Sequence, residues 1–96
     1  MDDHEARLKR LRMRSWRRGT REMDLILGPF ADAEIGGLDA ATLDAYERLL
    51  DENDQDLYPW VTARINGGTA GPAVHALLLD RIAAHAGGRL REIRGA

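Results

Sequence analysis

The sequence contains no cysteine among its 96 residues, and only 5% of its residues are aromatic. Without cysteine the chain has no disulfide framework, no thiol nucleophile and no thiolate ligands for zinc or an iron–sulfur cluster. Long hydrophobic runs are also missing: a transmembrane helix needs about 20 consecutive apolar residues, whereas stretches such as Leu25–Leu27 and Ala76–Leu79 are far shorter. We therefore expect a cytoplasmic protein that does not insert into membranes and is held together by packing alone.

Neither sign of charge dominates the sequence, since 14 Lys and Arg stand against 16 Asp and Glu for a net charge of −2. This near-balance argues against a general nucleic-acid coat or polyanion binder. The charges are nevertheless unevenly distributed, with a net of +4 in residues 1–22, −9 in 23–62 and +3 in 63–96. A chain with such blocks presents faces of opposite sign, which suits docking on another macromolecule.

The spacing of apolar residues predicts helices nearly throughout the chain, at i, i+3, i+4 and i+7. The expected buried positions are Leu8, Leu11 and Ser15; Met23, Ile26, Leu27 and Phe30; Leu43, Tyr46 and Leu50; Leu57, Trp60, Val61 and Ile65; and Val74, Leu77, Leu78 and Ile82. We expect one compact all-α domain over residues 1–96, a bundle of about five short helices, with a flexible basic tail at about 89–96.

The first three helix boundaries follow from local signals. A first helix is expected over residues 3–18, and Thr20 is a candidate N-cap for the second. Gly28-Pro29 should interrupt or kink that second helix, because proline removes the hydrogen bond that its N–H would make. Asp39 is expected to cap a third helix at roughly 40–51, with Leu38 and Leu43 in the positions of a hydrophobic staple.

The last two helices are bounded by proline and glycine. With Asp56 as N-cap of the fourth helix, Pro59 would fall at the N3 position, where its missing N–H has no helical partner anyway. Asn66-Gly67-Gly68 should end this helix. Pro72 is expected at the first position of the last helix, and Gly87-Gly88 should stop it.

Candidate catalytic and metal-ligating residues are scarce. His4, His75 and His85 include no pair at i, i+4 spacing, which argues against a metal site in a chain without cysteine. The acidic run 51–56 lacks the glycine and the bidentate glutamate of a calcium loop, and Ser15 has no histidine nearby in sequence to act as a base. We therefore expect no catalytic residue, no metal and no cofactor of the chain's own.

A basic stripe on the first helix permits a different interpretation. Arg10, Arg14 and Arg17 line the side opposite the apolar residues. Such a stripe is commonly a solvated face, and otherwise it meets an acidic protein more readily than a nucleic acid, because the acidic middle of the chain would repel phosphates. The alternative function is accordingly a regulatory or antitoxin-like module that binds a protein or nucleic-acid target through this helix.

One glycine separates two strongly helical segments and is surrounded by charges. Gly19 stands between Arg18 and Thr20, with Glu22 three residues on. In one interpretation Gly19 makes a tight helix–helix turn and the charges face solvent. In the other, Gly19 lets a partner's backbone approach, and Arg18 and Glu22 offer a donor fork and an acceptor beside it.

The segment Arg18-Gly19-Thr20-Arg21-Glu22 resembles the R-G-x-x-E signature of the SdhE-like succinate dehydrogenase assembly factors, which promote flavinylation. Further on, Leu49-Leu50 followed by Asp54-Gln55-Asp56-Leu57-Tyr58-Pro59-Trp60 resembles the second block of the family, L-L-x-x-x-D-x-D-L-(aromatic)-x-W. The resemblance covers about residues 5–65, in the right order and spacing. Pro59 inside the second block and the glycine-rich link before the last helix depart from the pattern.

The resemblance implies a non-enzymatic factor, expected to be a monomer, that binds the flavoprotein subunit of succinate dehydrogenase. Fumarate reductase is a second candidate client. The FAD and the histidine to which it becomes attached both belong to the partner. The implied contact residues are Arg18, Gly19 and Glu22, with Arg17 and Asp24 in support. The second block supplies residues that cap and pack the fourth helix beside the same surface, namely Asp54, Asp56, Tyr58 and Trp60.

Overall fold

The computed structural model describes the backbone of residues 3–95 and the side chains of residues 3–88. Its helices are α1 (Asp3–Trp16), α2 (Arg21–Glu34), α3 (Ala40–Leu50), α4 (Asp54–Ile65) and α5 (Ala76–Gly95), with short 3-10 turns η1 (Ile35–Gly37) and η2 (Ala73–His75). The described residues contain no strand, so the predicted all-α class is confirmed. The radius of gyration of 13.0 Å is that of a compact chain of about 100 residues.

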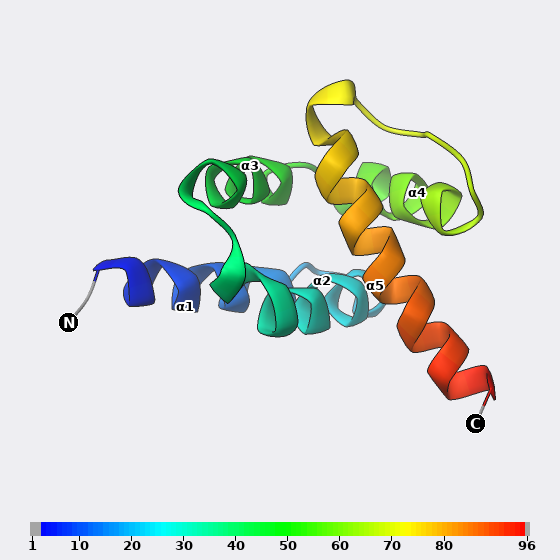
Figure 1. The fold of residues 1–96 in the computed structure, drawn as a ribbon, viewed down its shortest axis with the longest axis horizontal. Helices are drawn as coiled ribbons and strands as arrows, with labels where there is room; N and C mark the ends of the chain where they lie inside the picture. The colour runs from blue at the N-terminus through cyan, green and yellow to red at the C-terminus, as the bar shows by residue number, and fades with distance from the viewer. Residues whose placement is uncertain (1–2, 96) are drawn as a thin grey trace.

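The helices form two layers that the last helix joins. Helices α1 and α2 pack as an antiparallel pair, and α3 and α4 lie above them (Figure 1). Helix α5 packs against α4 and then passes along α2. The turn between α1 and α2 lies beside the turn between α3 and α4. The first motif block begins in the first of these turns, and the second block begins at the end of α3, just before the other turn.

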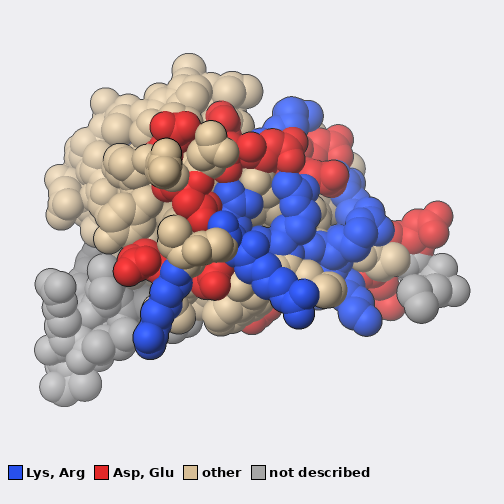
Figure 2. All heavy atoms as spheres, turned by 180° about the vertical axis from the view of Figure 1, so that it is seen from behind, with Lys and Arg blue, Asp and Glu red and all other residues tan. Residues whose placement is uncertain are grey.

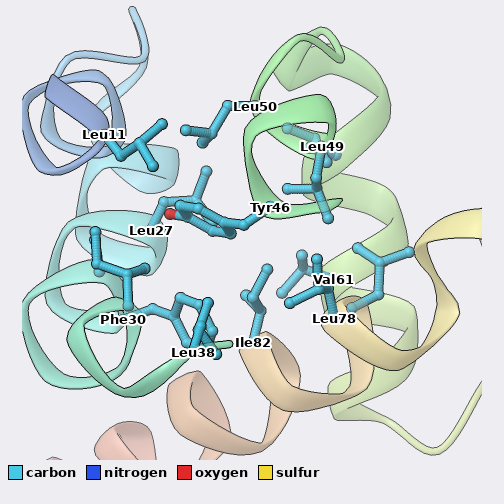
Figure 3. Close-up of a cluster of buried hydrophobic side chains, with 14 of the residues drawn as sticks. Leu11, Leu27, Phe30, Leu38, Tyr46, Leu49, Leu50, Val61, Leu78 and Ile82 are labelled. Carbon is cyan, nitrogen blue, oxygen red and sulfur yellow. The ribbon is translucent and has the colours of Figure 1, made fainter. Parts of the chain in front are cut away.

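The core lies where all five helices meet. Phe30 and Tyr46 are fully buried at its centre, with ring centroids 5.6 Å apart (Figure 3). The buried stripes of the first three helices agree with the sequence, except that Ile26 is only partly buried. On α4, Leu57 and Val61 are buried as expected, whereas Trp60 and Ile65 are only partly buried.

Both N-caps expected for the second and third helices are confirmed. The Thr20 hydroxyl accepts a hydrogen bond from the Met23 N–H at 3.4 Å, and the Asp39 carboxylate accepts one from the Thr42 N–H at 2.7 Å. The bonds with Thr42 lower the pKa of Asp39 below its ordinary value. A cap of this kind satisfies an N–H that has no partner within the helix.

Gly28-Pro29 was expected to interrupt or kink α2; the interruption is wrong, because α2 continues as a helix to Glu34, and the kink stays a prediction. Pro29 has no N–H, so the helix lacks only the hydrogen bond that this N–H would donate to the Leu25 carbonyl. Leu25 is exposed, and water can donate to its carbonyl instead. Gly28 has its own role: a Cβ at this position would overlap the indole of Trp16. The glycine therefore lets the Trp16 ring lie directly on α2.

The expected start of α4 is also wrong. The helix begins at Asp54 with Asn53 as N-cap, so Pro59 lies inside it and Asp56 belongs to its first turn. The earlier start has a structural cause, because side chains of the α1–α2 turn bind the carboxylate of Asp54. The expected end is confirmed, since Gly67 has a φ of 90° and follows the C-cap Asn66.

Three expectations for α5 are corrected. Pro72 caps η2 rather than opening α5. Because η2 is a 3-10 helix with about three residues per turn, it is wound more tightly than an α-helix and shifts which positions of the following segment face the core. Val74 and Leu77 are therefore 71% and 83% exposed, while Leu79 joins Leu78 and Ile82 in the core. Of the predicted stripe, Leu78 and Ile82 are therefore confirmed, whereas Val74 and Leu77 are wrong.

The expected stop at Gly87-Gly88 is wrong as well, because α5 runs on to Gly95. Neither glycine adopts the positive φ that ends helices. The predicted flexibility of about 89–96 stays a prediction, since Ala96 and the side chains of 89–95 lie outside the described residues.

Candidate functional site: the Gly19 turn

The α1–α2 turn is built around a glycine that no other residue replaces without strain. Gly19 has a φ of 104°, which L side chains rarely adopt, and it is exposed. A Cβ built on Gly19 would meet nothing within 4 Å. The turn therefore needs glycine for its backbone conformation, and the space outside it is open to a partner.

Arg18 holds this turn against the rest of the protein. Its guanidinium donates to the Leu50 carbonyl at 2.6 Å and to the Glu52 carbonyl at 2.7 Å. Its Nε donates to Asp54 Oδ1 at 2.9 Å, and the two side chains are only 10% and 12% exposed. All of these acceptors belong to the end of α3, the α3–α4 turn and the start of α4. The guanidinium is thus committed inside the protein and acts as a tie between two turns.

Asp54 and Asp24 complete this tie from two sides. The second oxygen of Asp54, Oδ2, accepts a hydrogen bond from the Thr20 hydroxyl at 3.4 Å. Asp24 Oδ1 accepts the backbone N–H of Arg18 at 2.6 Å. The first motif block is therefore bonded directly to the second, which explains why residues about 36 positions apart in sequence form one surface.

A shallow hollow of about 410 Å³ lies beside the turn. It is lined by Thr20, Glu22, Asp54, Gln55, Tyr58 and Pro59. Glu22 is exposed and makes no ion pair within the described residues, and Tyr58 is 42% exposed. These two side chains are therefore accessible to a partner seated at Gly19.

The structure brings most of the predicted site residues together, but not all of them. Arg18, Gly19, Glu22, Asp24, Asp54 and Tyr58 gather at the turn and its hollow. Arg17 is exposed immediately before them, and Asp56 is exposed on the first turn of α4. Trp60 packs elsewhere: its ring lies 6.4 Å from that of His75, and it contacts the Gly71 position.

Sequence reasoning missed two features of this region. It missed the carbonyls of Leu50 and Glu52 as ligands of Arg18, because a carbonyl carries no sequence signal. It also missed a second support of the same turn, in which His75 Nε2 lies 2.9 Å from Glu52 Oε2 and the His75 side chain is 6% exposed. Both links position the α3–α4 turn on which Arg18 rests.

Among residues 3–88 the rest of the surface carries no candidate metal site. No three His, Asp or Glu side chains come together there as metal ligands. No helix of the described chain is long and apolar enough to cross a membrane.

Lys and Arg gather as a band on the face opposite to that of Figure 1, with Asp and Glu at its borders (Figure 2). Arg14 in the predicted basic stripe is paired with Asp51 at 2.8 Å, so the stripe is not a free row of cations.

Comparison with known proteins agrees with this geometry. Residues 9–86 match the family described as flavinator of succinate dehydrogenase, a span that contains both motif blocks and the tie between them. The chain belongs to this family. The family resemblance of the two motif blocks is thereby confirmed, and so is the expected five-helix fold.

Two relatives illustrate how far the similarity to this flavinator family extends. The FAD assembly factor SdhE of Photobacterium profundum is 35% identical over 91 residues, 93% of each chain. The mitochondrial succinate dehydrogenase assembly factor 2 of Mycosarcoma maydis is 45% identical over 60 residues, 62% of this chain and 25% of that protein. The chain thus spans about a quarter of the fungal relative's length. No solved structure gave a significant match.

Proposed function

We propose that the chain is an assembly factor that binds the flavoprotein subunit of succinate dehydrogenase and promotes the covalent attachment of FAD to it. The observation that carries this proposal is that the family match contains both motif blocks and that Arg18 and Asp54 join these blocks into one surface at Gly19. The names of the relatives, FAD assembly factor and succinate dehydrogenase assembly factor, support the same function.

The mechanism follows from what the surface offers. Flavin attachment requires FAD, a histidine and acid or base groups of the partner in alignment. A factor that binds the aligned conformation more tightly raises its population in proportion to the difference in affinity, about tenfold for each 1.4 kcal/mol. In this proposal the chain supplies the binding surface, the FAD and its catalytic groups belong to the partner, and the factor itself is not an enzyme.

The roles within the surface differ from residue to residue. Gly19 allows the partner's backbone to approach, because nothing lies within 4 Å of the position of a side chain there. Glu22 pairs with the partner across the interface, with Tyr58 and the exposed Arg17 bordering it. Arg18 and Asp24 act from behind by fixing the turn, and Asp54 anchors Arg18.

Client, location and assembly state belong to the same proposal. Fumarate reductase is a second client to be tested beside succinate dehydrogenase, and the factor acts as a monomer in the cytoplasm. Fractionation of cells that express the tagged chain tests its location, and light scattering of the purified chain tests its assembly state.

Co-purification with the flavoprotein subunit tests the proposed binding. We expect the wild-type chain to retain the subunit and Gly19→Arg to lose it. Gly37→Arg is a matched control, because Gly37 is also exposed and also has open space where a side chain would be. Circular dichroism of both variants separates a lost contact from lost folding. Equal retention of the subunit by both variants would show that the Gly19 turn is not the contact site.

A further inference from the structure

A second hollow runs along one face of α1 and is not used by the Gly19 turn. It measures about 650 Å³ and is lined by Glu5, Leu8, Lys9, Arg12, Met13, Trp16 and Arg17. The positions from Glu5 to Trp16 are spaced by three and four residues, so they form one continuous face of α1 about 17 Å long at 1.5 Å per residue, and Arg17 follows directly after the helix. A face of this length matches three turns of a helix laid along it.

The floor of this hollow carries a fixed aromatic anchor. Trp16 is 39% exposed and Met13 is 45% exposed, whereas apolar side chains of this size are usually covered. The Trp16 ring lies on α2 at Gly28, and its Nε1 donates to Asp32 Oδ2 at 3.1 Å. The ring is therefore held in place before any partner binds, which lowers the entropic cost of using it as a binding hot spot.

Three of the four charged residues that line the hollow are basic. Arg7 and Arg14 of the same helix are paired with acids of α3 and the residue that follows it. Lys9, Arg12 and Arg17, by contrast, make no ion pair within the described residues. The hollow therefore complements a negatively charged partner.

We propose that this face of α1 is a second docking surface that binds an acidic amphipathic helix of the flavoprotein partner. The proposal rests on the proposed function, because the hollow is continuous with the Gly19 turn: Arg17 lines the hollow and directly precedes Arg18 in sequence. An apolar side chain of the partner helix contacts Trp16 and Met13, and its acids pair with the free cations, as in other helix-in-groove complexes.

A protein partner fits the hollow better than a nucleic acid does. An apolar floor of Trp16 and Met13 offers nothing to a phosphate backbone, whose binding depends on rows of cations. Glu5 closes one end of the hollow, and acidic side chains border the basic band (Figure 2). A nucleic acid longer than the hollow would be repelled by these acids. A short acidic helix of the partner would fit within the hollow and would not reach the acids that border the basic band.

The test compares adjacent charge reversals on the same helix. Lys9 lines the hollow and Arg10 does not, although both are exposed. Binding of the flavoprotein subunit to the immobilised full chain is measured by biolayer interferometry at low and high salt. We expect Lys9→Glu to weaken binding roughly fivefold, mainly through slower association and more strongly at low salt, and Arg10→Glu to change it less than about twofold. Met13→Asp, in the floor of the hollow, is expected to weaken binding roughly tenfold.

The outcomes separate this inference from the proposed function. If Lys9→Glu and Arg10→Glu have equal effects while Gly19→Arg abolishes binding, the second surface is refuted and the proposed function stands. If the wild-type chain does not bind the subunit at all, both are refuted. Binding of double-stranded DNA or free FAD that Lys9→Glu removes, with flavoprotein binding unchanged, would assign the hollow to a different ligand and overturn the proposal.

Discussion

Removing the guanidinium of Arg18 is the perturbation whose effect the structure defines best. In Arg18→Ala, the carbonyls of Leu50 and Glu52 lose their donors and Asp54 loses its ion-pair partner. Because the Arg18 and Asp54 side chains are 10% and 12% exposed, water does not fully replace the lost bonds. The variant therefore leaves a largely buried carboxylate without a countercharge.

The size of this effect follows from the number and kind of the lost bonds. A hydrogen bond to a charged group contributes about 1.5–3 kcal/mol, and breaking a buried ion pair by removing one partner costs about 3–5 kcal/mol. The three contacts act as one unit, so we expect Arg18→Ala to lower the free energy of unfolding by about 3–5 kcal/mol. Arg18→Lys keeps the positive charge but loses the planar fork of N–H donors that a guanidinium presents. We expect its free energy of unfolding to lie between those of Arg18→Ala and the wild type.

Urea denaturation followed by circular dichroism measures these differences. Arg14→Ala is the matched control, because Arg14 also joins α1 to the end of α3 but its ion pair with Asp51 is exposed, at 39% and 72%. Exposed pairs contribute about 1 kcal/mol or less, so this control should stay close to the wild type. If Arg18→Ala loses no more stability than Arg14→Ala, the interpretation of Arg18 as a buried structural tie is wrong.

Two further predictions concern the interior. Gly28→Ala places a methyl group where the Trp16 ring lies, so we expect a loss of about 1–3 kcal/mol in stability and a shift in tryptophan fluorescence; unchanged values would mean that Trp16 does not lie on α2. Burial raises the pKa of Tyr46 to about 12, above its value of about 10 in an unfolded chain. As the pH rises, the Tyr46 hydroxyl therefore loses its proton in the unfolded state before it does so in the folded state. The contribution of Tyr46 to the free energy of unfolding is full below about pH 10 and decreases by roughly 2–3 kcal/mol between about pH 10 and 12. Denaturation of wild type and Tyr46→Phe at several pH values checks this, and the account fails if both lose the same stability above about pH 10.

The hydroxyl of Tyr46 also shows what the sequence could not reveal. Ser15 donates its single proton to the Leu11 carbonyl at 2.7 Å, so the Tyr46 hydroxyl, 2.6 Å from Ser15 Oγ, is the donor in that contact. The apolar spacing correctly placed Ser15 and Tyr46 on buried faces. It could not pair them, because they lie on different helices 31 residues apart.

Local features of the fold were predictable, and features that depend on distant contacts were not. The caps Thr20 and Asp39 were found because a cap bonds to an N–H three residues away. The start of α4 was misplaced because Asp54 is held by Arg18, which is distant in sequence. The exposure of Val74 and Leu77 was missed because η2, a tighter turn that apolar spacing does not indicate, precedes α5.

The same distinction applies to the candidate site. The two motif blocks were recognised from their residues, and the structure shows how they join, through Arg18 and Asp54. The sequence suggested that Arg18 pairs with a partner, whereas its side chain is occupied within the protein. We therefore propose that the partner contacts Gly19 and Glu22, with Arg18 as the positioning residue behind them.

The most direct test of the central claim is reconstitution of flavin attachment. Purified flavoprotein subunit without covalent FAD is incubated with FAD and either the wild-type chain, Gly19→Arg or Gly37→Arg, and covalent flavin is read from in-gel fluorescence over time. The account predicts that covalent flavin accumulates faster with the wild type and Gly37→Arg than without the chain, and that Gly19→Arg gives only the rate without the chain. If Gly19→Arg, shown to be folded, accelerates flavin attachment as well as the wild type does, the account is contradicted.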